Sequence, residues 1–161
     1  MQLFGEDGGF DFMKGLHSNI NQYTKSGSAP IKAAGRGETT IGIVFMHDAV
    51  KQAVKGFPVK VVAPAEGTGY EIGSMSIIDG ARNMKEAKAF YDWALSADAQ
   101  NLALEVNAFQ VPSNTGAKTS ASAPDMSTIK LIDYDFKTYG SSATRKRLLK
   151  KWDDEVSVLA Q

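Results

Sequence analysis

The sequence predicts an α/β fold, in which short buried strands alternate with amphipathic helices. Two runs, Ile41–Phe45 and Val59–Ala63, are apolar, rich in β-branched residues and too short for helices, so each is predicted to be a buried strand. A third strand is expected at Ser74–Asp79. Helical patterns lie between and after these runs, which is the alternation typical of an α/β domain.

Helices are predicted where apolar residues recur every three or four positions. Phe12, Leu16 and Ile20 form such a stripe near the start of the chain. The clearest helix spans residues 85–95, and Ser96 is expected to cap a second helix that follows it directly. The other expected helices are Ile31–Arg36, Asp48–Lys55 and Thr144–Leu159. We expect His17 at the surface, and we expect four residues of the clearest helix in the core: Phe90, Tyr91, Trp93 and Leu95.

The composition argues against several classes of protein. The 161 residues suffice for one domain or for parts of two small lobes. Lys and Arg total 18, and so do Asp and Glu, so the chain lacks the basic excess of a nucleic-acid-binding protein. The absence of cysteine excludes disulfides and cysteine-ligated metals. No window approaches the roughly 18 apolar residues of a membrane span, and the first residues show no signal-peptide pattern.

Polar clusters follow the first two predicted strands and supply the candidate binding residues. His47 and Asp48 come directly after the first strand. The second strand is followed by a glycine-rich loop that carries Glu66, Tyr70 and Glu71. Ligands of open α/β sheets bind where strands end, so the two strand ends are predicted to form one wall of a cleft for a small ligand.

Each candidate also has a purely structural interpretation. Ser26-Gly27-Ser28 precedes a helix, where hydroxyls and free N–H groups suit an anion, but a plain cap and turn has the same pattern. His47 is compatible with a ligand role or a structural one, and Tyr70 with stacking or with packing at a rim. The glycine-rich loop matches neither the Walker pattern nor the dinucleotide-binding pattern.

An enzyme using His47 and Asp48 as acid and base is the less favoured function. Such catalysis needs a nucleophile or a metal within hydrogen-bond reach of the base. The chain has no cysteine, no Gly-x-Ser-x-Gly and no His-x-x-x-His. The sequence therefore favours a binding protein over a phosphate-handling α/β enzyme.

Three motifs resemble the second half of a bacterial periplasmic substrate-binding protein, the two-lobed receptor of an ABC importer. They are Gly37-Glu38-x-x-Ile41-Gly42-Ile43, Val61-x-x-Pro64-x-Glu66-Gly67-Thr68, and Gly80-Ala81-Arg82-Asn83-x-x-x-Ala87-Lys88-x-Phe90-x-x-Trp93-x-Leu95-Ser96-x-x-x-Gln100. The resemblance implies a periplasmic-binding-protein type II-like fold, truncated, with mixed sheets and flanking helices. Within this family the chain is most similar to the ferric-ion and sugar-phosphate binding branch.

The resemblance also implies a class of ligand. Ferric-binding members place two tyrosines just after the first strand, whereas this chain has His47-Asp48, which resembles the sugar-phosphate binders. His47, Asp48 and one of Glu66 or Glu71 would then face sugar hydroxyls, and Ser26-Gly27-Ser28 would lie by the phosphate. A ferric-iron receptor is the alternative, because His and carboxylates are iron ligands. We expect no catalytic residue, resident metal or cofactor.

The family pattern implies a division into lobes and a set of partners. Residues 1–76 are predicted to be part of the second lobe, 77–127 to return to the first lobe, and 128–161 to pack as a C-terminal helical segment on the second lobe. The expected partners are a small anionic ligand such as a sugar phosphate or phosphate, and the membrane permease of the importer, in the periplasm. Because such receptors are about twice this long, we expect a fragment whose open sheet drives formation of a homodimer.

Overall fold

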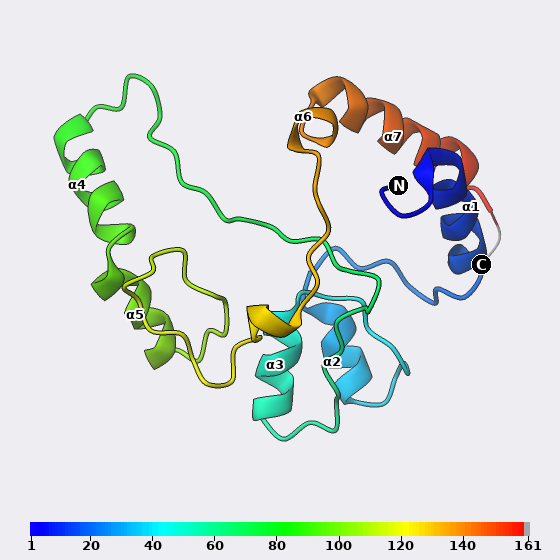
Figure 1. Cartoon of the computed structure of the whole chain (residues 1–161), viewed down its shortest axis with the longest axis horizontal. Coiled ribbons are helices and arrows are strands. Elements are labelled where there is room, and N and C mark those ends of the chain that lie inside the picture. The colour runs from blue at the N-terminus through cyan, green and yellow to red at the C-terminus, as the bar shows by residue number, and fades with distance from the viewer. Residues whose placement is uncertain (160–161) are drawn as a thin grey trace. The chain divides into compact units, whose positions relative to one another are not determined.

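The computed structural model describes residues 1–159, and its regular secondary structure is helical (Figure 1). The α-helices are α1 (Gly5–His17), α2 (Ala29–Gly35), α3 (Met46–Val54), α4 (Met84–Ala94), α5 (Ala97–Glu105), α6 (Phe136–Tyr139) and α7 (Ser142–Glu155), and η1 (Met126–Thr128) is a 3₁₀ turn. Within the described residues no helix is long and apolar enough to cross a bilayer.

The chain divides into two compact units. Unit 1 joins the two ends of the sequence, residues 1–24 and 131–161, and so contains α1, α6 and α7. Unit 2 is residues 25–130 and contains α2 to α5 with η1. The lobe boundaries implied by the family resemblance stay a prediction.

The helices follow the sequence closely. Ser96 caps α5 as expected, and its hydroxyl oxygen accepts a hydrogen bond from the Ala99 amide (3.2 Å). Gly37 follows α2 with a φ of 76°, a left-handed conformation that glycine adopts without steric cost. The short helix α6 was not predicted; Asp135 caps it by accepting a hydrogen bond from the Thr138 amide (2.9 Å).

The predicted strands are wrong for this chain. Among residues 1–159 the structure has no strand longer than a single bridging residue, so the mixed sheets are absent there. No residue of 41–44 or 60–63 forms a backbone–backbone hydrogen bond within the described chain. A strand is stable only when its N–H and C=O groups pair with a neighbour, and these segments find none.

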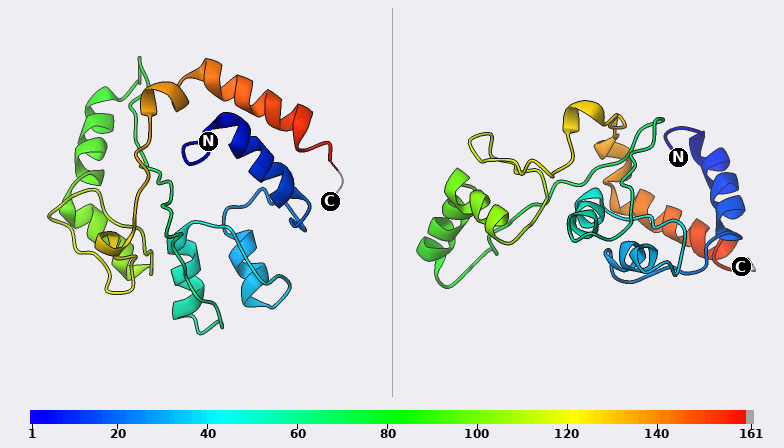
Figure 2. Two further views of the ribbon diagram at one scale, coloured as in Figure 1. Left: turned by 45° about the vertical axis from the view of Figure 1, so that its right-hand side comes forward. Right: turned by 90° about the horizontal axis from the view of Figure 1, so that it is seen from below.

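Unit 1 is held together by side chains from opposite ends of the sequence, α1 and α7, which lie side by side in Figures 1 and 2. Arg147 donates to Glu6 (2.7 Å for Nη2 to Oε2). Near the C-terminal ends of the same two helices, Lys14 Nζ lies 2.9 Å from Glu155 Oε2. Lys151 Nζ sits 4.6 Å from the centre of the Phe10 ring, which is buried beneath it. These contacts dock α1 on α7.

Unit 2 places α2 against α3 (Figure 2), and the segment between them passes tightly over α2. A Cβ added to Gly42 would lie 2.8 Å from the Pro30 carbonyl oxygen, closer than real side-chain atoms approach. Ile31 of α2 and Ala49 of α3 are buried in this contact layer. Gly42 is therefore the point at which the extended chain packs most closely against α2.

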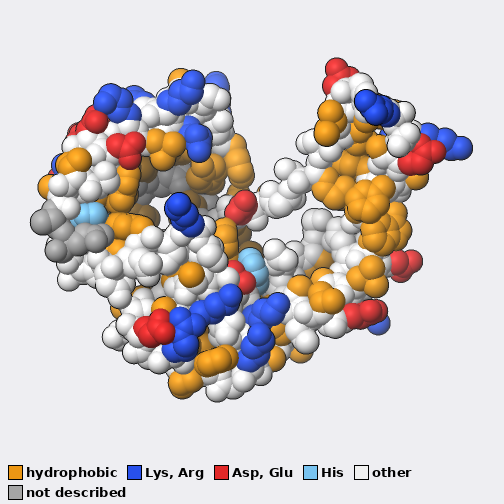
Figure 3. Space-filling model, turned by 180° about the vertical axis from the view of Figure 1, so that it is seen from behind, with side chains coloured by type: hydrophobic (Ala, Val, Ile, Leu, Met, Phe, Trp, Pro, Cys, Tyr) orange, Lys and Arg blue, Asp and Glu red, His pale blue; other side chains and the backbone are white. Residues whose placement is uncertain are grey.

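The apolar face of α4 is exposed, contrary to expectation. Phe90, Trp93 and Leu95 were predicted in the core, but all three are exposed, and hydrophobic side chains gather over α4 in the space-filling view (Figure 3). The Phe90 and Trp93 rings instead contact each other, with centroids 5.4 Å apart. Within the described residues the layer that this face would cover is not present.

Candidate functional site

The Ser26-Gly27-Ser28 loop leads directly into α2. Ser26 and Gly27 are exposed and Ser28 is half-buried. Ser28 is the N-cap residue, as predicted, but its hydroxyl forms no hydrogen bond to the helix N–H groups. The Ala29 amide donates to the Ser26 carbonyl (3.2 Å), and the two serine hydroxyl oxygens lie 3.5 Å apart. The loop thus presents two neighbouring hydroxyls at a helix start, an arrangement that suits an anion.

Phe45 links this loop to His47. A Cβ placed on Gly27 would lie 3.6 Å from two atoms of the Phe45 ring, which is ordinary van der Waals contact. The Phe45 ring also stacks on the His47 imidazole, with centroids 5.6 Å apart and planes inclined by 18°. Sequence reasoning missed Phe45 because it assigned this residue to a strand core.

His47 and Asp48 occupy the first turn of α3, and both side chains are half-buried. His47 Nε2 and Asp48 Oδ2 are 3.9 Å apart, longer than a hydrogen bond. Asp48 lies where a carboxylate interacts favourably with the positive end of the helix dipole. An imidazole and a carboxylate in this position offer a ligand one donor or acceptor and one acceptor side by side.

The glycine-rich loop carries the remaining candidates. Glu66, Tyr70 and Glu71 are all exposed. The loop turns at Gly67, which has a φ of 121°, and the Thr68 amide donates to the Lys130 carbonyl (2.9 Å). The structure therefore brings the serine loop and the His47–Asp48 pair together through Phe45. No hydrogen bond or ion pair given for residues 1–159 joins Glu66 or Glu71 to that group.

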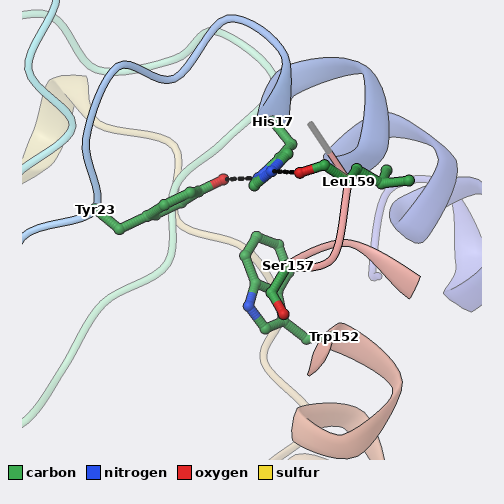
Figure 4. Close-up of a pocket in the computed structure, with 5 residues that line it drawn as sticks. All are labelled: His17, Tyr23, Trp152, Ser157 and Leu159. Carbon is green, nitrogen blue, oxygen red and sulfur yellow. Dashed lines mark hydrogen bonds between the residues drawn. The ribbon is translucent and has the colours of Figure 1, made fainter. Parts of the chain in front are cut away.

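A hollow also lies in unit 1, away from these residues. It has a volume of about 610 Å³ and is lined by His17, Tyr23, Trp152, Ser157 and Leu159 (Figure 4). His17 was predicted at the surface, but its side chain is only 3% exposed. Its Nδ1 is 2.9 Å from the Tyr23 hydroxyl and its Nε2 is 3.1 Å from the Leu159 carbonyl oxygen. Because a carbonyl only accepts, Nε2 carries the proton and Nδ1 of the neutral ring accepts from Tyr23.

His17 is buried because it joins two distant parts of the chain. Its ring stacks on Tyr23 (5.6 Å between centroids) and meets Trp152 edge-on (6.2 Å). Both ring nitrogens are satisfied by the protein itself, so this cluster has the properties of a small core. None of the predicted ligand-binding residues lines it.

The described part of the chain has no cluster of side chains that is already arranged to bind a metal ion. No group of three His, Cys, Asp or Glu side chains that could hold an ion occurs among residues 1–159. His47 and Asp48 are two possible ligands, and an iron site would need others.

Comparisons with known proteins identify the family of this chain. The profile of the family described as "Bacterial extracellular solute-binding protein" matches residues 1–138. A protein of Haemophilus influenzae is 48% identical over 159 residues, which is 98% of this chain and 46% of that protein.

Two solved structures have the same backbone course. The periplasmic binding protein AfuA from Actinobacillus pleuropneumoniae, solved with exogenous fructose-6-phosphate bound, is 52% identical with a TM-score of 0.91, over 98% of this chain and 50% of AfuA. The periplasmic binding protein P5PA is 41% identical with a TM-score of 0.88, over 97% of this chain and 50% of P5PA. The chain thus spans about half the length of these relatives, and the predicted periplasmic-binding-protein resemblance is confirmed, although the mixed sheets are not seen. The chain belongs to the bacterial extracellular solute-binding protein family.

Proposed function

We propose that this chain is part of the solute-binding component of an ABC importer, which binds a small anionic, hydroxylated ligand such as a hexose phosphate between two lobes in the periplasm. The observation that carries the proposal is the 52% identity to AfuA, whose solved structure holds fructose-6-phosphate. Nothing in this function requires a chemical step, and the partner of the loaded receptor would be the membrane permease of the importer.

The proposed site has two chemically distinct parts. Ser26, Gly27 and Ser28 would receive the phosphate, because two hydroxyls and a helix start favour negative charge. His47 and Asp48 would hydrogen-bond the sugar hydroxyls, since together they offer donors and acceptors. The Phe45 ring contacts both parts, because it lies beside Gly27 and stacks on the His47 imidazole. One of Glu66 or Glu71 would complete the hydroxyl contacts, with Tyr70 at the rim.

The test is a titration followed by amide and imidazole NMR signals of the isotope-labelled chain. Millimolar fructose-6-phosphate is expected to shift the signals of Ser26–Ser28 and of the His47 ring. Inorganic phosphate should shift only the loop, and fructose should shift neither strongly. NMR is chosen because a site shared between two lobes loses most of its affinity when one lobe is missing.

Variants separate the roles in this titration. His47→Ala should abolish the ring signal and the preference for the sugar phosphate over phosphate, whereas Lys146→Ala, in unit 1, should change nothing. Glu66→Gln and Glu71→Gln, compared with each other, identify the glutamate that contacts the ligand. Signals that shift with Fe(III) and not with fructose-6-phosphate would replace the proposal with the ferric-ion alternative. An unchanged spectrum with every ligand, also after the chain has been joined to the rest of a receptor, would refute it.

A further inference from the structure

Phe45 is an aromatic residue at a position where helices rarely have one. It is the N-cap residue of α3, with extended backbone angles (φ −63°, ψ 135°), and its side chain gives the helix no capping hydrogen bond. Ser, Thr, Asp and Asn are preferred at N-caps because their side-chain oxygens accept from the first helical N–H groups. The phenyl ring is also 49% exposed, so burial in a core does not account for it. A residue that departs from a local preference without a packing gain is expected at a functional site.

The Phe45 ring contacts both parts of the proposed site, and all of these residues belong to unit 2. Its Cδ2 and Cε2 atoms lie 3.6 Å from the place where a Cβ on Gly27 would stand. The same ring stacks on the His47 imidazole, with the two planes inclined by 18°. The contacts of this exposed ring are therefore made with residues that we propose to bind the ligand.

The two histidines of the chain are held in different ways. Both ring nitrogens of His17 are in hydrogen bonds, with the Tyr23 hydroxyl and with the Leu159 carbonyl. Within residues 1–159 neither ring nitrogen of His47 has a hydrogen bond, since the 3.9 Å between its Nε2 and Asp48 Oδ2 is too long for one. The orientation of the His47 ring must therefore depend on a contact of another kind.

Aromatic stacking can hold an imidazole plane without using its nitrogens. Rotation about the last side-chain bond of histidine has only broad, weakly preferred minima, so a ring without hydrogen bonds needs a neighbour to keep one orientation. The face of Phe45 supplies this neighbour and leaves both nitrogens of His47 free to meet a ligand. A side chain that is already ordered loses less entropy when the ligand binds.

We propose that Phe45 is a positioning residue, whose ring orients the His47 imidazole beside Asp48 so that the pair meets sugar hydroxyls together, and which thereby sets the preference for a sugar phosphate over inorganic phosphate. The inference deepens the proposed function and rests on it for the ligand. The orientation of the imidazole, in contrast, is a property of the chain without ligand and can be measured separately.

Phe45→Leu separates the aromatic face from the apolar contact, because leucine keeps an apolar side chain beside Gly27 but offers no ring to His47. In NMR spectra of the full chain, the ring-current displacement of the His47 ring protons should disappear, and carbon relaxation should show a more mobile imidazole. The dissociation constant for fructose-6-phosphate should rise about three- to tenfold, because the ring must now be ordered on binding. The constant for inorganic phosphate should stay within about twofold, since the loop contacts remain.

Phe57→Leu is the matched control. Phe57 also belongs to unit 2, is 40% exposed and lies beside a glycine of α2, because a Cβ on Gly35 would stand 3.3 Å from its ring. This variant should change neither the His47 ring signals nor the preference between the two ligands. Phe45→Tyr keeps the aromatic face and should retain both properties of the parent.

Phe45→Ser distinguishes a role in the site from a role in the fold. Serine supplies the capping acceptor that α3 lacks, so the amides of α3 should exchange with solvent no faster than in the parent. The preference for fructose-6-phosphate should nevertheless fall as it does in Phe45→Leu. An equally stable helix with weaker binding is not expected of a residue that serves only to hold the fold.

Each outcome decides the proposal. Unchanged His47 ring signals and relaxation in Phe45→Leu would overturn it, and so would equal losses of affinity for fructose-6-phosphate and inorganic phosphate. Loss of α3 amide protection in both Phe45→Leu and Phe45→Ser would show that the ring holds the helix, and would overturn it too. If the parent binds no fructose-6-phosphate but Phe45→Leu still mobilises the imidazole, the positioning role stands and the proposed ligand is refuted.

Discussion

Unit 1 and unit 2 differ in how their polar side chains and backbone groups find hydrogen-bond partners. Unit 1 pairs residues from the two ends of the sequence. Both ring nitrogens of His17 are in hydrogen bonds, and the Glu6 carboxylate accepts a hydrogen bond from Arg147. Unit 2 is larger, but its apolar runs have exposed side chains and unpaired backbones. Side-chain contacts between two distant helices can therefore complete a small helical unit, whereas a strand needs a neighbour that the described part of this chain does not provide.

The largest effect is expected from Phe10, which tests whether unit 1 has a true core. Phe10→Ala should lower the free energy of unfolding of unit 1 by about 3 kcal/mol, because it removes a buried ring and leaves a cavity beneath Lys151. Urea unfolding is followed by the fluorescence of Trp152 in a Trp93→Phe background, so that the signal comes from unit 1 alone.

Phe12 is the matched control for Phe10 on the same helix. Its ring is exposed and contacts only Phe4 among the aromatic rings of the described chain. Phe12→Ala should therefore shift the urea midpoint far less. Equal losses for the two variants would show that unit 1 lacks a specific core and resembles unit 2.

The next largest loss of stability is expected at Gly42, where the extended segment 41–45 of unit 2 packs against α2. Gly42→Ala places a Cβ 2.8 Å from the Pro30 carbonyl oxygen, so the backbone must move, at a cost of about 1–3 kcal/mol. Thermal unfolding followed by circular dichroism at the helix band measures it. Gly73→Ala is the control, because nothing lies within 4 Å of the added Cβ. A stable Gly42→Ala variant would mean that the segment is not anchored on α2.

Local signals explain why the helices were predicted well and the strands were not. Ser96 and the apolar spacing of 85–95 act within one helix, so the sequence carries all that is needed. The run Ile41–Phe45 has strand composition, but strand formation depends on partners far away in sequence. The same dependence explains the errors at Trp93, which stays exposed among the described residues, and at His17, which is buried and hydrogen-bonds the Leu159 carbonyl 142 positions away.

The candidate site was predicted in part for the same reason. His47, Asp48 and Ser26–Ser28 were predicted from their places beside expected elements; Phe45 contacts both Gly27 and His47, and their role in binding stays a prediction. Phe45 was missed because its contact with Gly27 is a tertiary one. The positions of Glu66 and Glu71 relative to the ligand stay predictions. Both lie on the glycine-rich loop, and the packing of that loop depends on segments distant in sequence.

A smaller effect is expected from the Tyr23 hydroxyl. Tyr23→Phe keeps the ring stacking on His17 but removes the donor to Nδ1, so unit 1 should lose about 1 kcal/mol. The Trp152 urea curve measures the loss, and the nitrogen shifts of His17 show whether the tautomer persists. Tyr91→Phe in unit 2 is the control. An unchanged curve for Tyr23→Phe would show that solvent already satisfies Nδ1, and that the cluster is less closed than its burial indicates.

The smallest effect is expected from the surface pair of Glu6 and Arg147, and it depends on pH. The hydrogen bond from Arg147, helped by Lys151, lowers the pKa of Glu6 from 4.5 to about 2, against a smaller opposing effect of desolvation. A carboxylate with a depressed pKa stabilises the folded state fully above pH 4.5, and the stabilisation is lost as the pH falls toward about 2. Exposed ion pairs contribute little, so the change should be small.

Glu6→Gln isolates this contribution from that of the other carboxylates. The variant should flatten the decline in unit 1 stability between pH 4.5 and about 2, and should leave the difference from the parent constant above that range. Glu38→Gln is the counterpart in unit 2, where the pKa of Glu38 is also lowered by Arg36, only two residues away. Because the Glu38 pair joins neighbours in sequence and the Glu6 pair joins α1 to α7, only Glu6→Gln should change the Trp152 transition. If both variants changed it equally, the long-range pairing that distinguishes unit 1 would not be what holds its two helices together.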